Sequence, residues 1–99
     1  MHFVVFATHN QGMGQERSRL SDVFGDYLHD PTHHPDVTVH HGGPTLGESD
    51  DTVTGLLLVL EAPSLEAARE FVAASPYATA GIIAESQIRA WNWLTGRPG

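Results

Sequence analysis

The sequence predicts an α+β fold whose elements follow the order strand, helix, strand, strand, helix, strand. Three observations support this prediction. Two stretches repeat apolar residues at helical spacing, four stretches are apolar or alternate apolar with polar residues, and clusters of proline, glycine and polar residues separate them. This order is the split βαβ, or ferredoxin-like, pattern, which forms a four-stranded antiparallel sheet with two helices on one face.

The first strand is predicted at Phe3–Ala7, where β-branched and aromatic residues suit a strand buried on both faces. The run stops at Thr8, and Gly12 and Gly14 then form a flexible turn. His9 therefore lies at the point where the buried strand leaves the core. That position suits a functional imidazole, although an exposed loop histidine is an equally ordinary interpretation.

The first helix is predicted from Gln15 to about His29. Its apolar residues recur at helical spacing: Leu20, Val23, Phe24, Tyr27 and Leu28. Arg17 lies seven residues before Phe24, so both side chains fall near one face of the helix. The stem of Arg17 could lie along the apolar face and carry its guanidinium to a pocket edge, whereas an ion-paired, solvated arginine is the alternative. For Phe24 the alternative is an ordinary core residue.

Histidines are concentrated between His29 and His41, a stretch that contains five of the seven in the chain. Asp30-Pro31 ends the first helix, and Val37–His40 then alternates apolar with polar residues as a second strand does. Zinc sites need converging ligands, whereas adjacent histidines on a strand point to opposite faces. No metal site is therefore predicted, and His40, or His41 beside it, is a pocket candidate.

The second half of the chain continues the pattern. Residues 42–45 are predicted as a turn and residues 46–51 as a polar loop. The near-continuous apolar run from Thr52 to Ala62 is the best candidate for a central strand. Pro63-Ser64 breaks that run, with the serine well placed as an N-cap, and a second helix is predicted from Leu65 to Ala74.

A Ser75-Pro76-Tyr77 corner follows the second helix, because proline lacks an amide hydrogen and favours extended geometry in the residue before it. The corner is either a plain chain break or the wall of a pocket. The last strand is predicted at residues 86–94, with Trp91 and Trp93 on one face and aliphatic residues on the other, so that both faces would be covered. Residues 95–99 are predicted as a tail.

Length and composition indicate one globular domain, residues 1–99, with 40% hydrophobic and 17% charged residues. A formal net charge of -7 argues against nucleic acid as a partner. The absence of cysteine excludes disulfides and a thiolate nucleophile. No apolar run approaches the ~18 residues of a membrane span, so a cytoplasmic protein without membrane contact is expected. A second copy would cover the free face of so small a sheet, which predicts a symmetric homodimer.

Over nearly its whole length the sequence resembles the YCII superfamily. The resemblance rests on features that are weak singly and specific together: Phe3–Ala7, Arg17, Gly43-Pro44, the long third strand, Glu66-Ala67-Ala68, Pro76-Tyr77 before Ala80-Gly81, and Ile88-Arg89 with Trp91 and Trp93. It implies a dimeric α-β barrel with a cleft near the first helix and the Pro76-Tyr77 corner.

Three positions depart from the pattern of that family. The family usually has histidine where this chain has Phe24, aspartate where it has Ser75, and aspartate where it has His9. Two ionisable groups are therefore replaced by a phenyl ring and a hydroxyl, and at the third position an imidazole replaces a carboxylate. A more apolar cleft with one base suits a small aromatic substrate better than a charged one.

The resemblance extends to a branch of the family that removes HCl from chlorinated hydroxyhydroquinones without a metal or an organic cofactor. It implies that His9 takes a phenolic proton as general base, oriented by a carboxylate for which Asp36 is the first choice. Arg17 would stabilise the phenolate or the departing chloride, and Ser75 would bind a substrate oxygen. The residues expected to bind the substrate are Phe24, Pro76, Tyr77 and His40, the last also being the alternative base.

Two other functions stay open at this point. One is a cofactor-free monooxygenase acting on a polyhydroxylated aromatic compound. The other is a non-catalytic dimer that binds a small molecule, because loss of the usual His/Asp pair is also what decay of an activity produces. The fold by itself does not separate these functions, since one scaffold hosts many.

Overall fold

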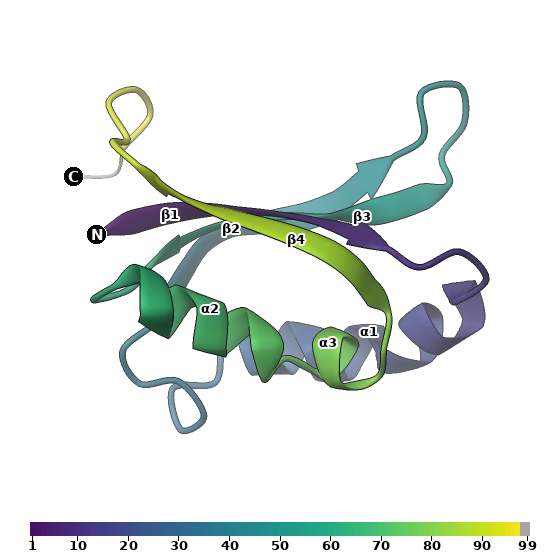
Figure 1. The fold of residues 1–99 in the computed structure, drawn as a ribbon, viewed down its shortest axis with the longest axis horizontal. Coiled ribbons are helices and arrows are strands. Elements are labelled where there is room, and N and C mark those ends of the chain that lie inside the picture. The colour runs from purple at the N-terminus through teal and green to yellow at the C-terminus, as the bar shows by residue number, and fades with distance from the viewer. Residues whose placement is uncertain (98–99) are drawn as a thin grey trace.

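The computed structural model describes residues 1–97. Of the predicted tail, residues 95–99, the last two therefore lie outside the described residues. Four antiparallel strands form one sheet in the order β2-β3-β1-β4, and the helices cover one of its faces (Figure 1). The elements are β1 (His2–His9), α1 (Gly14–Leu28), β2 (Thr38–Leu46), β3 (Val53–Glu61), α2 (Leu65–Ala73), α3 (Pro76–Thr79) and β4 (Ile83–Trp91). The predicted ferredoxin-like βαββαβ fold is confirmed. Within the described part, no helix combines the length and the apolar character needed to cross a membrane.

The central strand β1 divides the sheet into a helix-covered face and a free face. Phe3, Val5 and Ala7 are buried and belong to the core cluster that includes residues of α1 and α2. The alternate residues of β1 point the other way, and Phe6 is 48% exposed there. We call this second side, which carries His2 and Phe6 of β1, the open face.

The two long helices are attached to the sheet by different means. α2 buries Ala68, Phe71 and Val72, and Ser64 caps it by accepting a hydrogen bond from the amide of Ala67 at 3.1 Å. α1 is more polar, and Phe24 is its buried residue. α1 therefore has fewer fully buried side chains than α2.

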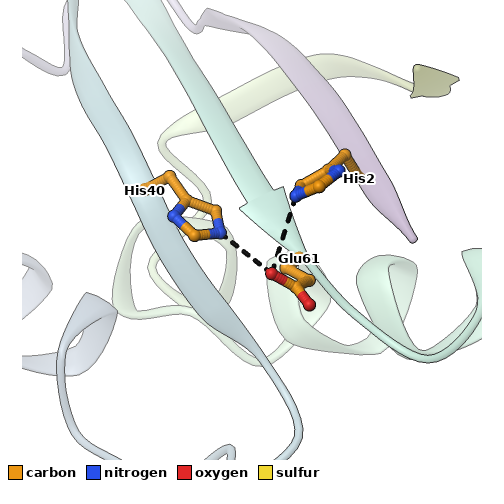
Figure 2. Close-up of side chains that lie close together, drawn as sticks. All are labelled: His2, His40 and Glu61. Carbon is orange, nitrogen blue, oxygen red and sulfur yellow. Dashed lines mark hydrogen bonds and ion pairs between the residues drawn. The ribbon is translucent and has the colours of Figure 1, made fainter. Parts of the chain in front are cut away.

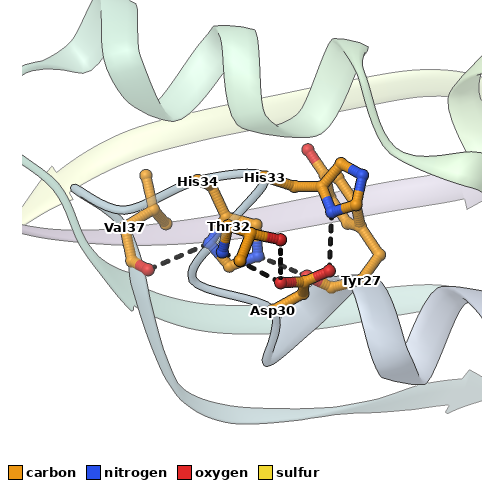
Figure 3. A network of polar contacts seen from close by, with 6 residues as sticks. All are labelled: Tyr27, Asp30, Thr32, His33, His34 and Val37. Carbon is orange, nitrogen blue, oxygen red and sulfur yellow. Dashed lines mark hydrogen bonds and ion pairs between the residues drawn. The ribbon is translucent and has the colours of Figure 1, made fainter.

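The segment after α1 is organised by the carboxylate of Asp30 (Figure 3). That carboxylate accepts hydrogen bonds from the amide and the hydroxyl of Thr32 at 2.9 and 2.6 Å, and it contacts the ring of His33 at 2.6 Å. These contacts, the Thr32 hydroxyl first, lower the pKa of Asp30 to about 2. A short local network thus fixes the turn that leads to β2.

His34 in the same segment is buried and structural. Its ring lies between the backbone carbonyls of Tyr27 and Val37 (Figure 3), with the Nδ1 to Val37 O distance at 3.1 Å. The imidazole also meets the ring of Phe71 edge-on, with centroids 4.7 Å apart. His34 therefore ties the connection between α1 and β2 to the core.

The structure corrects the predicted boundaries in two places. Residues 42–45 were predicted as a turn, but they are part of β2, where Gly43 and Pro44 lie opposite Leu57 and Leu56 of β3. Because β2 is an edge strand, glycine and proline disturb few hydrogen bonds of the sheet there. The Pro76-Tyr77 corner is not an irregular loop either, since Pro76–Thr79 forms the short helix α3.

The prediction for the last strand was wrong at both ends. β4 begins at Ile83 and stops at Trp91, so Trp93 is not part of it. In the single chain β4 is largely exposed rather than covered on both sides. Trp93 is 4% exposed and lies against the ring of His2, with centroids 5.5 Å apart, so the chain folds back over the open face after β4.

Candidate functional site

A cavity of about 290 Å³ lies between α1, α3 and the sheet. We call it the aromatic cavity. Its lining is mostly apolar and comes from five elements; the lining residues are His9, Arg17, Ser21, Phe24, Leu28, Gly42, Gly43, Pro44, Val53, Gly55, Leu56, Leu58 and Tyr77. A concave, largely apolar site with a few polar groups is the usual form of a small-molecule site.

One stripe of α1 forms a wall of this cavity. Arg17, Ser21, Phe24 and Leu28 are spaced by four, three and four residues, which places them on one face of the helix. The first two are polar and the last two are apolar. The wall therefore offers charge and a hydroxyl at one end and an apolar surface at the other.

Tyr77 connects the groups of the site to one another. Its ring stacks on Phe24 with centroids 4.0 Å apart and planes within 2°, and it meets the ring of His9 edge-on at 5.6 Å. Its hydroxyl donates a hydrogen bond to the backbone carbonyl of Arg17 at 3.3 Å. Burial raises the pKa of Tyr77, so this hydroxyl stays protonated near neutral pH. Tyr77 thus holds α1 against α3 and fixes one side of the imidazole.

His9 stands at the end of β1, where the register with β4 shifts between Thr8 and His9. The next residue anchors this end, because Asn10 donates from its amide to Ile82 O at 2.7 Å and from its side chain to Gly81 O at 2.8 Å. Gly81 adopts a φ of 75°, which glycine accepts without strain. These contacts place His9 beside the segment that carries Tyr77.

The imidazole of His9 has an unusual environment. Both of its ring nitrogens are buried, and neither has a hydrogen-bond partner among residues 1–97. Burial, and then the positive charge of Arg17, lower the pKa of His9 below its ordinary value. The ring is therefore neutral at neutral pH and able to accept a proton. Buried polar atoms without partners are rare, so these two nitrogens make His9 a candidate for contact with a ligand.

A second cavity, of about 530 Å³, adjoins the first. It is lined by the turn from Asn10 to Gly14, by Thr52 just before β3, and by the first two residues of β3, Val53 and Thr54. His9, Arg17 and Val53 line both cavities. The imidazole and the guanidinium therefore lie at the boundary between the aromatic cavity and this outer space, where a ligand entering from outside would meet them.

Ser75 and Pro76 are placed differently from the prediction. Ser75 is buried, its hydroxyl donates to Val72 O at 2.7 Å, and it accepts a hydrogen bond from the amide of Ala78 at 3.3 Å as the N-cap of α3. Its side chain borders a void of about 10 Å³ behind Phe24 rather than the aromatic cavity. Pro76 is the first residue of α3 and lines neither large cavity. In this structure both residues position Tyr77 instead of meeting a substrate.

Asp36 and His40 lie away from the aromatic cavity. Asp36 borders a separate groove beside His34, so it does not orient His9. His40 contacts Glu61 at 3.1 Å on the open face, and Trp93 covers it there. Of the predicted site residues, the structure therefore brings together His9, Arg17, Phe24 and Tyr77.

Sequence reasoning missed Ser21, Leu28 and the stretch from Gly42 to Pro44 as parts of the wall. For Ser21 and Leu28 a signal existed, because they continue the spacing of Arg17 and Phe24 along one face of the helix. For residues 42–44 no local signal existed. Their place depends on the pairing of β2 with β3.

The matching family model describes a YCII-related domain and covers residues 1–92. The chain belongs to the YCII-related family. This match confirms the family that the sequence motifs indicated, over nearly the whole chain. No curated protein sequence matches it.

Among solved structures, the chain is similar to 5-chloro-2-hydroxyhydroquinone dehydrochlorinase (TftG) from Burkholderia phenoliruptrix AC1100, solved in complex with 2,5-dihydroxybenzoquinone. The two are 28% identical with a TM-score of 0.79, over 93% of this chain and 94% of that one.

Two more distant structures share the fold alone. SnoaB, a cofactor-independent oxygenase from Streptomyces nogalater, is 12% identical with a TM-score of 0.54, over 97% of this chain and 96% of that one. A dimeric ferredoxin-like protein of unknown function from Bacteroides fragilis NCTC 9343 is 12% identical with a TM-score of 0.56, over 89% and 90%.

Proposed function

We propose that the protein is a dehydrochlorinase that removes HCl from a chlorinated hydroxyhydroquinone and releases a hydroxybenzoquinone. The observation that carries the proposal is the pair of buried, partnerless ring nitrogens of His9 at the edge of a cavity lined by aromatic and aliphatic side chains. The likeness to TftG, an enzyme named for this reaction, supports the same substrate class.

The aromatic cavity suits a flat, hydroxylated ring. The stacked rings of Phe24 and Tyr77 give an apolar wall, and aliphatic residues of β3 complete the lining. Arg17 and His9 lie together at the mouth, where the hydroxyl groups of the substrate would meet a cation and a neutral base. The ring nitrogens of His9 are covered in this structure, so the imidazole or a side chain that covers it has to shift when the substrate enters.

The reaction is balanced without an external oxidant. His9 takes the proton of the hydroxyl next to the chlorine-bearing carbon, that oxygen becomes a ketone, and the chlorine-bearing carbon gains a proton. The hydroxyl para to the first then loses its proton. The new carbonyl forms as the C–Cl bond breaks, and chloride leaves with the bonding electron pair. The sum is loss of one H⁺ and one Cl⁻.

The other polar groups of the cavity have supporting roles in this proposal. The guanidinium of Arg17 stabilises the phenolate that forms first and the chloride that leaves last. Burial first, and then the charge of Arg17, lower the pKa of His9, which favours an unprotonated imidazole that can act as a base. No carboxylate is assigned to orient His9. The edge of Tyr77 holds the ring instead.

A binding protein without catalysis is the second candidate, and one observation favours it. His9 has no acidic partner among the described residues, whereas imidazole bases in enzymes are commonly oriented by one. Such a protein would hold a quinone-like ligand in the aromatic cavity and release no chloride.

Chloride release from 5-chloro-2-hydroxyhydroquinone by purified, EDTA-treated protein separates these functions. The dehydrochlorinase proposal predicts release well above the spontaneous rate without oxygen consumption. Oxygen uptake without chloride would identify the cofactor-free monooxygenase. Binding of 2,5-dihydroxybenzoquinone without turnover of the chlorinated compound would identify the binding protein. Either of these last two results contradicts the proposal.

The homodimer predicted from the sequence also stays a proposal, and the open face supports it. Phe6 and Leu57 are cross-strand neighbours there and are 48% and 40% exposed, so they form an apolar patch in the single chain. Light scattering coupled to gel filtration should give a dimer mass for the unaltered protein and a monomer mass for Phe6→Glu. Val23→Glu, at a 52% exposed residue of α1, is the matched control and should stay dimeric. A monomeric unaltered protein would end this proposal.

A further inference from the structure

Three side chains with metal-binding atoms converge on the open face, away from the aromatic cavity. His2 of β1, His40 of β2 and Glu61 of β3 come from three neighbouring strands (Figure 2). The carboxylate oxygen Oε1 of Glu61 lies 3.1 Å from Nε2 of His40 and 3.6 Å from Nε2 of His2. One ligand atom from each of the three residues lies within 4.8 Å of the others.

The backbone is arranged to bring these residues together. His2 lies directly opposite Glu61 in the pairing of β1 with β3. In the pairing of β2 with β3, Val39 lies opposite Leu60 and His41 opposite Val59, so His40 is an extra residue in a β-bulge. A bulge redirects the side chain of the extra residue. Here it turns the imidazole of His40 toward the carboxylate of Glu61, as Figure 2 shows.

Trp93 fixes the two imidazoles. Its indole meets the ring of His2 at 5.5 Å and that of His40 at 5.6 Å, both edge-on, and it is 4% exposed. The side chains of His2 and His40 are 16% and 22% exposed, whereas Glu61 is 52% exposed. The imidazoles are thus held between the indole and the sheet, while the carboxylate side of the cluster faces solvent in the single chain.

We propose that His2, His40 and Glu61 form a binding site for a divalent first-row transition ion such as Zn²⁺. Zinc takes imidazole nitrogen and carboxylate oxygen at about 2.0–2.2 Å, which puts tetrahedral neighbours roughly 3.3–3.6 Å apart. The separations of 3.1 and 3.6 Å from Oε1 of Glu61 to the two imidazole nitrogens bracket this range, so the carboxylate already stands at ligand spacing from both imidazoles. All three ligand atoms lie within 4.8 Å of one another. Two imidazoles and one carboxylate leave a fourth coordination position, which takes water.

The alternative is that Glu61 only accepts hydrogen bonds from the two imidazoles. Titration of metal-free protein with Zn²⁺ in a calorimeter distinguishes these cases. The proposal predicts one ion per chain, and His40→Ala and Glu61→Gln should each weaken binding by more than ~100-fold, because loss of even an outer partner of a metal ligand costs about 10–100-fold. Glu61→Gln keeps the size and the hydrogen-bonding oxygen of the side chain.

His33→Ala is the matched control, because His33 also touches a carboxylate, that of Asp30, but no third metal-binding side chain among residues 1–97 joins this pair. It should bind Zn²⁺ as the unaltered protein does. A measurement without mutation guards against misfolded variants: the Nε2 resonances of His2 and His40 should shift on addition of Zn²⁺ in the unaltered protein. No saturable binding, equal binding by Glu61→Gln, or unmoved His2 and His40 resonances would overturn the proposal.

Discussion

Gly55 is the position where the structure leaves the least room for a side chain. A Cβ built there lies 1.9 Å from the carbonyl oxygen of Ala7 and 3.1 Å from the hydroxyl oxygen of Thr45. Ordinary contacts of this kind are 3.4–4 Å long, so Gly55→Ala forces the backbones of β1 and β3 apart by more than an ångström. The first contact is with backbone rather than a flexible side-chain end, so a rotamer change does not relieve it.

The cost of Gly55→Ala follows from that displacement. Overpacking in a core costs about 1–3 kcal/mol, and each weakened ladder hydrogen bond adds about 1 kcal/mol, so we expect a loss of about 3 kcal/mol or more in the free energy of unfolding. In a domain of this size that loss lowers the melting temperature by roughly 12–24 °C. Because β1 ends in His9, the same displacement also moves the imidazole.

Urea and thermal unfolding followed by circular dichroism test this expectation. Gly43→Ala is the matched control, since Gly43 lies in the paired strand β2 and its Cβ would meet nothing within 4 Å. The control should be within ~0.5 kcal/mol of the unaltered protein or slightly more stable. If the two alanine variants unfold at the same denaturant concentration, the close approach of β1 and β3 at Gly55 is refuted.

Three further predictions concern charge and hydrogen bonding. Arg17→Met removes the cation that lowers the pKa of His9, so the low-pH midpoint of kcat/KM should move upward; an unmoved midpoint in a pH–rate profile contradicts that coupling. Tyr77→Phe removes the hydrogen bond to the Arg17 carbonyl and should cost about 1 kcal/mol by urea unfolding, with no loss if the bond is absent. Asp30 has its pKa lowered from 3.8 to about 2, so its stabilising contribution is complete above pH 3.8 and lost as the pH falls through about 2. Asp30→Asn should therefore be less stable than the unaltered protein at neutral pH, and the difference should shrink as the pH falls through about 2; a constant difference contradicts this.

The fold could be predicted because its signals are local. The helical spacing of apolar residues and the long apolar run of β3 lie within single elements, and their order alone indicates the ferredoxin-like arrangement. The errors concern properties that the whole sheet decides. Gly43 and Pro44 resemble a turn unless β2 is known to be an edge strand. In the sequence, Trp93 continues the alternation of aromatic and aliphatic residues along the last strand, although the chain leaves the sheet after Trp91.

In the candidate site, too, the residues with a local sequence signal could be predicted and those that depend on packing could not. His9 at a strand end and Arg17 on the face of Phe24 follow from the sequence pattern, and the structure brings them together with Tyr77. The role of Ser75 had a local signal, since a serine before proline at a helix start is a typical N-cap. The prediction that Asp36 orients His9 had no such local signal. Asp36 is separated from His9 by the way the segment after α1 packs, which no spacing in the sequence indicates.

The most direct test of the proposed function is the rate of chloride release by His9→Ala beside that of His29→Ala, a change at the exposed residue that follows α1. If His9 is the general base, His9→Ala should lose about 10²–10⁴-fold in chloride release. It should still bind 2,5-dihydroxybenzoquinone, and His29→Ala should match the unaltered protein. Equal rates for the unaltered protein and His9→Ala would contradict the assignment of His9.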